Sequence, residues 1–430
     1  MGTRSKLIRL IRYFFEAQKP SEDAAKARPV PWWRTMDWPL LGIILLLLLE
    51  GLVAVYSTSV AFAVTRTDNP AFFFVMRQAL SGIVGLALML GGWYKGYGFL
   101  RQRPRVVFLL ALAIAAALLF LLISNRRAGT TGRTLVGGSL QPAEFVKPVL
   151  ILYLAAWLTS RRRDMSHWRT ELVYVGVITG VFGLLVLLQP DLSAAATVFA
   201  LGMMMLVLAG LHPKQLFFTL GVATAVTGIG VIAVPWLYPV GVTRFRDFWI
   251  AWRHPAEVRG HLREAFWAFL RGGWFGVGIG EGQSKFYYLP LPHTDSVFAV
   301  IGEEWGVVGA SVVVLSFVLL LWRGMVIAMR ASDPFGRLVA GGITFWIVGE
   351  AFLNMGGIMG VLPEAGNVLP FFSYGGSNLV VTLGSLGLVL GVARESRRAQ
   401  GGHRRAVVDL RRGNRRRRVP RAGRVAAPEV

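Results

Sequence analysis

The residues best suited to chemistry lie in one run, Leu289-Pro-Leu-Pro-His-Thr-Asp-Ser-Val-Phe-Ala-Val-Ile-Gly-Glu-Glu304, where a polar loop meets an apolar segment. The run places one carboxylate, Asp295, directly after His293 and Thr294. A carboxylate at such a boundary can cap the helix that follows it. It can also act as a base on a substrate at the membrane face. The spacing alone favours the cap.

Other ionisable residues lie within apolar segments, where charge is costly and usually has a purpose. Glu144 and Lys147 are three residues apart, so on a helix they share a face and can pair. Such a pair either locks two helices together or lines a polar cavity, and the sequence supports both interpretations equally. Asp191 follows Gln189-Pro190 and is expected to cap a helix that begins at Leu192, which does not exclude a cavity role.

Four further carboxylates are expected to be buried. Glu303 and Glu304 are adjacent, so they point to different faces of a helix and at most one can reach a given pocket. Glu50 and Glu350 are expected to have buried partners and no catalytic role.

The elements that must position these groups are membrane spans. The chain has 430 residues, 54% of them hydrophobic, and long uncharged runs. Its lack of cysteine excludes disulfides, thiol nucleophiles and cysteine metal sites. A span needs about 20 mostly apolar residues. This predicts an all-α integral membrane protein with ten spans: Trp38–Val60, Ala79–Trp93, Val106–Ser124, Pro142–Thr159, Leu172–Leu188, Leu192–Leu211, Gln215–Tyr238, Val297–Trp322, Leu338–Met359 and Asn378–Ala393.

Charge orients this bundle. The net charge of +23 is concentrated in a basic segment over 1–37 and an Arg-rich tail over 394–430, which is expected to be disordered. Both flank the membrane block of 38–393, which favours anionic lipid over nucleic acid as their neighbour. The positive-inside rule places both termini in the cytoplasm. Segment 1–37 is polar, so it is not a cleavable signal.

The loop over 239–296 is by far the longest and lies outside the membrane in this orientation. A helix is predicted from Pro255 to Gly272-Gly273, with an apolar face that suits the outer membrane interface. The glycines of Gly272–Gly280 follow no strand, which favours a flexible, close-packed loop over a nucleotide cradle. Arg133, Arg244 and Arg246 lie in outside loops against the charge rule, and together they favour an anionic ligand. For Arg244 or Arg246 taken alone, a solvated loop face or contact with lipid headgroups is the slightly favoured alternative.

Four motifs resemble the SEDS family (shape, elongation, division and sporulation), which includes RodA and FtsW. They run in the family's order: Gln141-Pro-Ala-Glu-Phe-Val-Lys147, Gln189-Pro-Asp-Leu192, His293-Thr-Asp295 with Gly302-Glu-Glu304, and the segment from Asn354 to Leu-Pro-Phe-Phe-Ser-Tyr-Gly-Gly-Ser377. The resemblance covers roughly 38–393, and the Gly272–Gly280 stretch and long tails are more similar to FtsW than to RodA.

The resemblance implies a ten-span peptidoglycan glycosyltransferase. Such proteins polymerise lipid II at the outer face of the bacterial cytoplasmic membrane, together with a class B penicillin-binding protein that acts as transpeptidase, in division or elongation. It implies Asp295 as the catalytic base. It also implies that Glu144, Lys147 and Asp191 are residues of a substrate cavity, which Arg77 and Arg133 line. The outer loop and the motifs add further candidate substrate contacts: Arg244, Arg246, His293, Thr294 and Ser373.

The chain departs from the family pattern near these residues. Leu291 stands where Glu is usual, Ser296 where Phe is common and Thr134 where Trp is usual, and a loop Gln is replaced by His261 or a neighbour. Lipid II carries a diphosphate, and a divalent cation, Mg²⁺ or Mn²⁺, would help the arginines of the outside loops to neutralise its negative charge. Two other functions stay open: a lipid II flippase and a non-catalytic scaffold that recruits a penicillin-binding protein.

Overall fold

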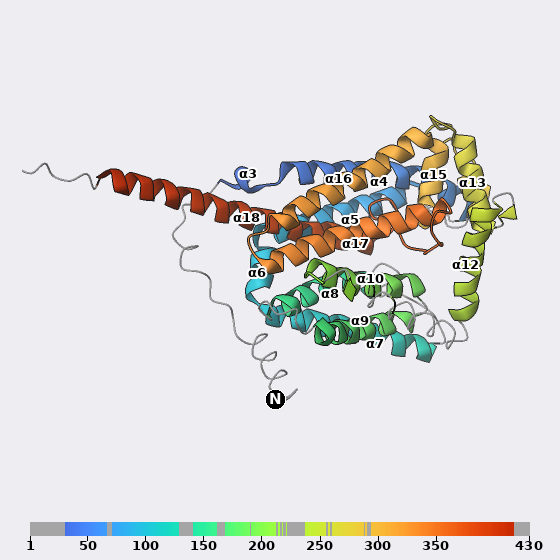
Figure 1. The fold of residues 1–430 in the computed structure, drawn as a ribbon. Helices are drawn as coiled ribbons and strands as arrows, with labels where there is room; N and C mark the ends of the chain where they lie inside the picture. The colour runs from blue at the N-terminus through green and yellow to red at the C-terminus, as the bar shows by residue number, and fades with distance from the viewer. Residues whose placement is uncertain are drawn as a thin grey trace, which may run out of the picture.

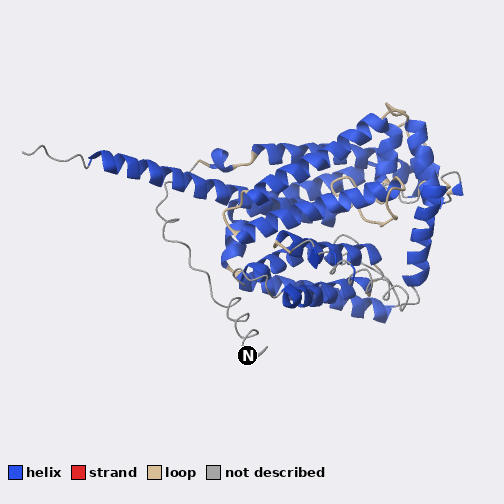
Figure 2. Cartoon of the chain, viewed as in Figure 1, coloured by secondary structure: helices blue, strands red, loops and turns tan. Residues whose placement is uncertain are grey.

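The computed structural model describes residues 31–66, 71–128, 141–160, 168–189, 191–211, 214–215, 217, 221, 237–254, 257–258, 260–287, 289 and 294–416. Throughout these residues the regular secondary structure is helical, with no strand (Figure 2). The predicted all-α membrane fold is confirmed.

Nine apolar helices correspond to predicted spans. They are α4 (Trp38–Arg66), α5 (Ala71–Gly91), α7 (Pro104–Ala128), α8 (Pro142–Ser160), α9 (Trp168–Leu187), α10 (Leu192–Leu208), α16 (Gly306–Met329), α17 (Pro334–Ile358) and α18 (Gly376–Arg416). Among the described residues, eight of these helices are long and apolar enough to cross a membrane, and α10 is shorter. Most of the predicted seventh span, Gln215–Tyr238, lies outside the described residues.

The helices form two groups that α17 joins (Figure 1). One group holds α4, α5, α16 and α18, and the other holds α7, α8, α9 and α10. Helix α17 packs against α8 and α10 as well as α16 and α18. Its buried residues face all directions, as expected of a helix enclosed by others.

Two span boundaries differ from the prediction. The second span begins at Ala71 instead of 79, and it continues through a π-helix (Gly92–Gly96) into α6 (Tyr97–Gln102). Arg77 interrupts the apolar run in sequence, but on the helix it is flanked by exposed apolar side chains such as Phe72 and Met76. Helix α18 runs to Arg416, past the boundary predicted at 394, and projects from the bundle in Figure 1. The predicted disordered tail therefore begins with helix.

The prediction of one continuous eighth span, Val297–Trp322, is wrong. The short helix α15 (Val297–Glu304) ends at Trp305, and α16 starts at Gly306, whose φ of 68° lies in the left-handed region. The outer loop fills the break: the N–H groups of Val277 and Gly278 donate to the carbonyls of Glu303 and Glu304 at 3.0 and 3.1 Å. The backbone groups freed by the break are thus satisfied by the loop.

In return, the N–H groups of Val307 and Val308 donate to the carbonyls of Gly273 and Trp274, at 2.9 and 3.1 Å. A Cβ atom on Gly276 would lie 2.1 Å from the carbonyl oxygen of Glu304, so only glycine allows this approach. The expectation of a close-packed glycine loop is confirmed at this point, and its glycines serve backbone contact.

The described residues of the outer loop include the helices α12 (Leu237–Arg253), α13 (Gly260–Gly272) and α14 (Ser284–Tyr287). Helices α12 and α13 run across the end of the bundle in Figure 1. The predicted helix ends correctly at Gly272 but starts at Gly260; Pro255 lies outside the described residues. Helix α13 packs on α15 and α16, with Phe269 against Phe298. It therefore covers α15 directly.

Candidate functional site

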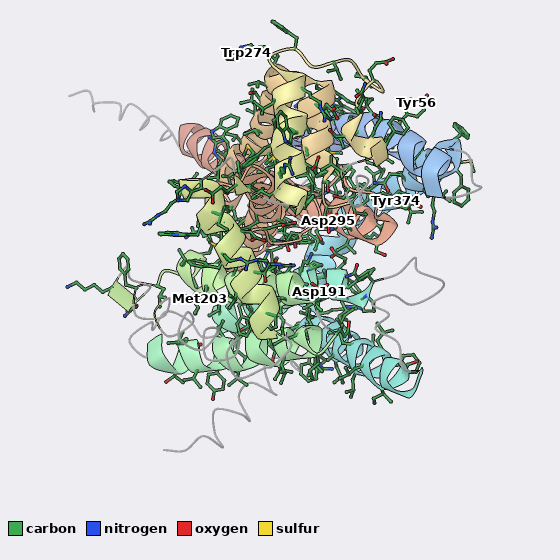
Figure 3. All side chains as sticks on the ribbon, turned by 90° about the vertical axis from the view of Figure 1, so that its right-hand side faces the viewer. Tyr56, Asp191, Met203, Trp274, Asp295 and Tyr374 are labelled. Carbon is green, nitrogen blue, oxygen red and sulfur yellow. The ribbon has the colours of Figure 1, made fainter. Side chains whose placement is uncertain are left out.

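Asp295 lies at the end of the bundle where α12 and α13 cross, and Figure 3 shows this end with Asp191 below it. Two side chains hold its backbone from behind. Asn354 Nδ2 donates to the carbonyl of Asp295 at 3.1 Å, and Ser373 Oγ donates to the carbonyl of Thr294 at 2.7 Å. Asn354 lies on α17 and Ser373 on the loop before α18, so the core of the bundle fixes the position of Asp295.

The same two residues brace the loop between α17 and α18. Asn354 Nδ2 also donates to the carbonyl of Asn367 at 2.6 Å, and Ser373 Oγ accepts from the N–H of Leu369 at 2.8 Å. Each side chain thus joins the loop to the segment that carries Asp295. The predicted site residue Ser373 acts here through the backbone of Thr294.

The electrostatic surroundings of Asp295 combine burial with charges of both signs. Burial raises the pKa of its carboxyl group, and Glu364 raises this pKa further. His261 on α13 and Arg244 on α12 act in the opposite direction, as does a hydrogen bond from Thr294. The net effect is a raised pKa, which makes the Asp295 carboxylate a stronger base than an ordinary aspartate.

Asp295 precedes the cap position of α15. The N-cap residue is Ser296, and its side chain makes no capping hydrogen bond to the helix. The geometry therefore does not give Asp295 the capping role that the spacing favoured.

Arg244 lies beside the site, whereas Arg246 lies at the surface. Arg244 Nη1 donates to Ser193 Oγ and to the carbonyl of Ala365, both at 3.3 Å, so this guanidinium joins α12, α10 and the α17–α18 loop. Arg246 is two-thirds exposed and faces Asp247 at 3.6 Å. Of these two arginines, Arg244 is the one with direct electrostatic influence on Asp295.

A second polar cluster joins three helices within the membrane block. Lys147 Nζ lies 3.0 Å from Glu144 on its own helix α8 and 2.6 Å from Glu350 on α17. Asn378 on α18 donates to Glu144 at 2.7 Å, and the Trp346 indole donates to Glu350 at 2.8 Å. Each of the three charged side chains is at most 7% exposed, so the cluster links α8, α17 and α18.

The remaining predicted residues lie in different places. Asp191 caps α10 as predicted, accepting from the N–H of Ala194 at 3.1 Å. Arg77 is exposed on α5. His293 and Arg133 lie outside the described residues.

Glu303 and Glu304 point to different neighbours, as expected. Glu304 lies 2.6 Å from Lys285 Nζ and accepts from the Ser57 hydroxyl, and both members of this ion pair are almost fully buried. Glu303 accepts from the N–H of Ser284 at 3.1 Å and faces Arg271 at 3.6 Å. Both carboxylates therefore fasten the outer loop to the bundle.

The sequence assigned no site role to four residues around Asp295, namely Glu364, Asn354, His261 and Ser296, which come from segments far apart in the chain. His261 and Ser296 stood out as departures from the family pattern, and Asn354 and Glu364 lie in the fourth motif that resembles the family. Glu350 was expected to have a buried partner, and the partner is Lys147.

Comparison with known proteins places the chain in a family. The family model described as "Cell cycle protein", which covers FtsW, RodA and SpoVE, matches residues 38–398. Stage V sporulation protein E of Bacillus subtilis (strain 168) is 33% identical over 363 residues, which cover 84% of this chain and 98% of that protein. A "Probable peptidoglycan glycosyltransferase FtsW" of Nitrosococcus halophilus (strain Nc4) is 37% identical over 368 residues, covering 84% and 93%.

Solved structures share the fold. The crystal structure of the rod shape determining protein RodA of Thermus thermophilus is 25% identical, with a TM-score of 0.58, over 85% of this chain and 99% of that one. A chain of a peptidoglycan synthase complex, studied for how polymerization and crosslinking are coordinated, is 24% identical with a TM-score of 0.63, over 84% and 98%. With its family match over most of its length, this multi-pass membrane protein belongs to the SEDS family of FtsW, RodA and SpoVE proteins.

Proposed function

We propose that this chain is a peptidoglycan glycosyltransferase that polymerises lipid II at the outer face of the bacterial cytoplasmic membrane, with Asp295 as its base. The observation that carries the proposal is the setting of Asp295. Its carboxylate is partly buried at one end of the bundle, its backbone is held by Asn354 and Ser373, and Arg244 lies nearby. The names of the relatives support the reaction class.

The reaction needs a base because the 4-hydroxyl of the acceptor sugar must lose its proton as its oxygen attacks the anomeric carbon of the donor. The bond from that carbon to the diphosphate oxygen breaks, and the diphosphate leaves as an anion. An α-linked donor then gives a β-linked strand by a single displacement with inversion. One carboxylate suffices, because the leaving group needs no proton, in contrast to the two carboxylates of glycoside hydrolases.

Positive charge must stabilise the departing diphosphate. Arg244 is the best placed of the described candidates, since Lys147 is already held by two carboxylates. Arg246 would act at the solvent edge. Among the described residues no group of three or more His, Asp or Glu could hold a metal ion.

The orientation and the partner belong to the same proposal. Both termini lie in the cytoplasm, and the outer loop of α12 to α14 faces outwards, as the positive-inside rule requires. A class B penicillin-binding protein would cross-link the strands. The synthase complex that shares this fold supports such a partner.

The test is polymerisation of purified lipid II in detergent by wild-type protein, Asp295→Ala and Asp295→Asn, with and without a cognate penicillin-binding protein. We expect both variants to lose about 10²–10⁴-fold in rate, the usual contribution of a positioned base. The exposed loop residue Glu257 provides a matched control, since Glu257→Gln should keep the wild-type rate. Because detergent leaves no bilayer to cross, a flippase or scaffold would make no polymer here. Wild-type rates in both Asp295 variants would refute the base assignment.

The pH profile gives a second readout. The raised pKa of Asp295 means that its carboxylate is protonated at a higher pH than an ordinary aspartate. The rate should therefore begin to fall on the acid side at a higher pH than an unperturbed aspartate would give.

A further inference from the structure

The His261 side chain is held at both ring nitrogens. Its Nδ1 lies 2.7 Å from Glu364 Oε1, in the loop between α17 and α18. Its Nε2 lies 2.6 Å from Ser296 Oγ, at the start of α15. One imidazole therefore connects the outer helix α13, the α17–α18 loop and the turn that carries Asp295.

The chemistry of the neighbours fixes one of the two protons. The pKa of Glu364 is lowered, first by the hydrogen bond from His261, so this carboxyl group is ionised near neutral pH and can only accept. Nδ1 of His261 therefore carries a hydrogen. Nε2 accepts from the Ser296 hydroxyl when the ring is neutral and donates to it when the ring is charged.

The order carboxylate, imidazole and hydroxyl is that of a hydrolytic triad. A nucleophilic role for Ser296 does not fit, because this residue is completely buried and no acyl group can reach its oxygen. The arrangement is suited instead to holding a segment and to placing an ionisable ring beside it.

That segment is the catalytic one in the proposed function. Ser296 directly follows Asp295 and is the N-cap residue of α15. Three charged side chains act on the Asp295 carboxylate: His261 from α13, Glu364 from the α17–α18 loop and Arg244 from α12. Of these, His261 has the largest influence, and it favours the ionised carboxylate.

We propose that His261 is a positioning residue that pins the Asp295 turn through Ser296 and sets the pH range of strand synthesis through its own charge. This inference rests on the proposed function. It assigns a role to two of the positions at which the chain departs from its family pattern, His261 and Ser296, which contact each other in this structure.

The experiment compares pH–rate profiles of lipid II polymerisation for wild type, His261→Gln and Ser296→Ala. Glutamine has a similar reach but no titratable charge, so the Asp295 carboxylate should protonate at a higher pH. The acid limb of the profile should therefore lie at higher pH than in wild type, and the ratio of the rate near pH 8 to that near pH 6 should rise above the wild-type ratio. Ser296→Ala keeps the His261 ring but removes the hydroxyl group that contacts it. Its kcat should fall, while its KM and its ratio of rates near pH 8 and pH 6 should stay close to the wild-type values.

Asp295→Asn serves as the reference, and unfolding midpoints in detergent check that each variant is folded. An unchanged pH ratio in folded His261→Gln, with Asp295→Asn inactive, would overturn the inference and leave the proposed function standing. An active Asp295→Asn would instead refute the assignment of Asp295 as the base, and absence of polymer from the wild-type protein would remove the proposed function. If His261→Gln does not fold, Ser296→Ala, which removes one oxygen atom, carries the test, and a wild-type kcat in it would refute the positioning role.

Discussion

Lys147 offers the sharpest test of how this membrane block is held together. Its ammonium group is 2% exposed and lies between two carboxylates, at 3.0 Å from Glu144 and 2.6 Å from Glu350. Replacing it by methionine keeps most of the side-chain volume and leaves the two carboxylates facing each other without a cation. Removing one partner of a buried ion pair typically costs about 3–5 kcal/mol.

The stability lost in Lys147→Met should depend on the hydrogen bonds and charges that Glu144 and Glu350 retain. In Lys147→Met, Glu144 keeps the hydrogen bond from Asn378 and Glu350 keeps that from Trp346, so the excess negative charge is the main cost. Adding Glu350→Gln removes one of the two charges and should recover more than half of the loss. The matched control is Lys95→Met at an exposed lysine, which should change the unfolding free energy by no more than about 0.5 kcal/mol.

The assay is reversible denaturant unfolding of purified protein in detergent, followed by helix content, together with lipid II polymerisation. We expect Lys147→Met to lose stability and Lys147→Met/Glu350→Gln to regain both stability and activity. If Lys147→Met unfolds like wild type and yet makes no polymer, Lys147 acts on the substrate instead of locking the helices, and our account of the cluster is refuted.

Two further predictions concern the fold. An alanine in the left-handed region costs about 1–2 kcal/mol of folding free energy. Gly276→Ala should destabilise the protein by more than this, because its Cβ would lie 2.1 Å from the Glu304 carbonyl oxygen. Gly280→Ala, at a glycine of positive φ in open space, should show only the conformational cost when thermal unfolding is measured. Asp37 is buried, which raises its pKa, but hydrogen bonds from Arg323 and the Leu40 N–H and the charges of Arg323 and Arg397 together outweigh burial, so the pKa is lowered. Its stabilising contribution is therefore complete above the unfolded-state pKa and is lost as pH falls, so the stability difference between wild type and Asp37→Asn should shrink below about pH 4. A constant difference across that range would contradict the assignment.

The sequence predicted the spans well where apolar runs are long and end in strong signals. Pro142 opens α8 and Asp191 caps α10, and both helices start where expected. It failed where tertiary contact overrides a continuous apolar run. The predicted span Val297–Trp322 runs across Trp305, and its composition gives no sign of the helix break. The carbonyl groups that the break frees accept hydrogen bonds from loop residues that follow Gly276, far from Trp305 in the sequence.

For the candidate site, the sequence named Asp295 and three of its neighbours, Thr294, Arg244 and Ser373, but not the contacts that connect them to distant segments. Local spacing could pair Glu144 with Lys147, since both lie on one helix, but it could not supply Glu350 from a helix two hundred residues away. Similarly, nothing local connects His261 to Glu364 and Ser296. The Lys147–Glu350 pair depends on the packing of α17 against α8, and the contacts of His261 depend on the packing of α13 over α15. No periodic pattern in the sequence encodes either packing.

The broken eighth span has a mechanical consequence. The loop backbone at 273–278 is hydrogen-bonded to both sides of the break. The tip of this loop carries Trp274 and Phe275, which are 71% and 84% exposed. A displacement of the tip would therefore also displace the end of α15. Helix α15 is a rigid rod of eight residues, about 12 Å long, and Asp295 lies at its other end. A molecule that binds the two exposed aromatic rings would therefore be connected, through the loop backbone and α15, to the segment that carries the Asp295 carboxylate (Figure 3).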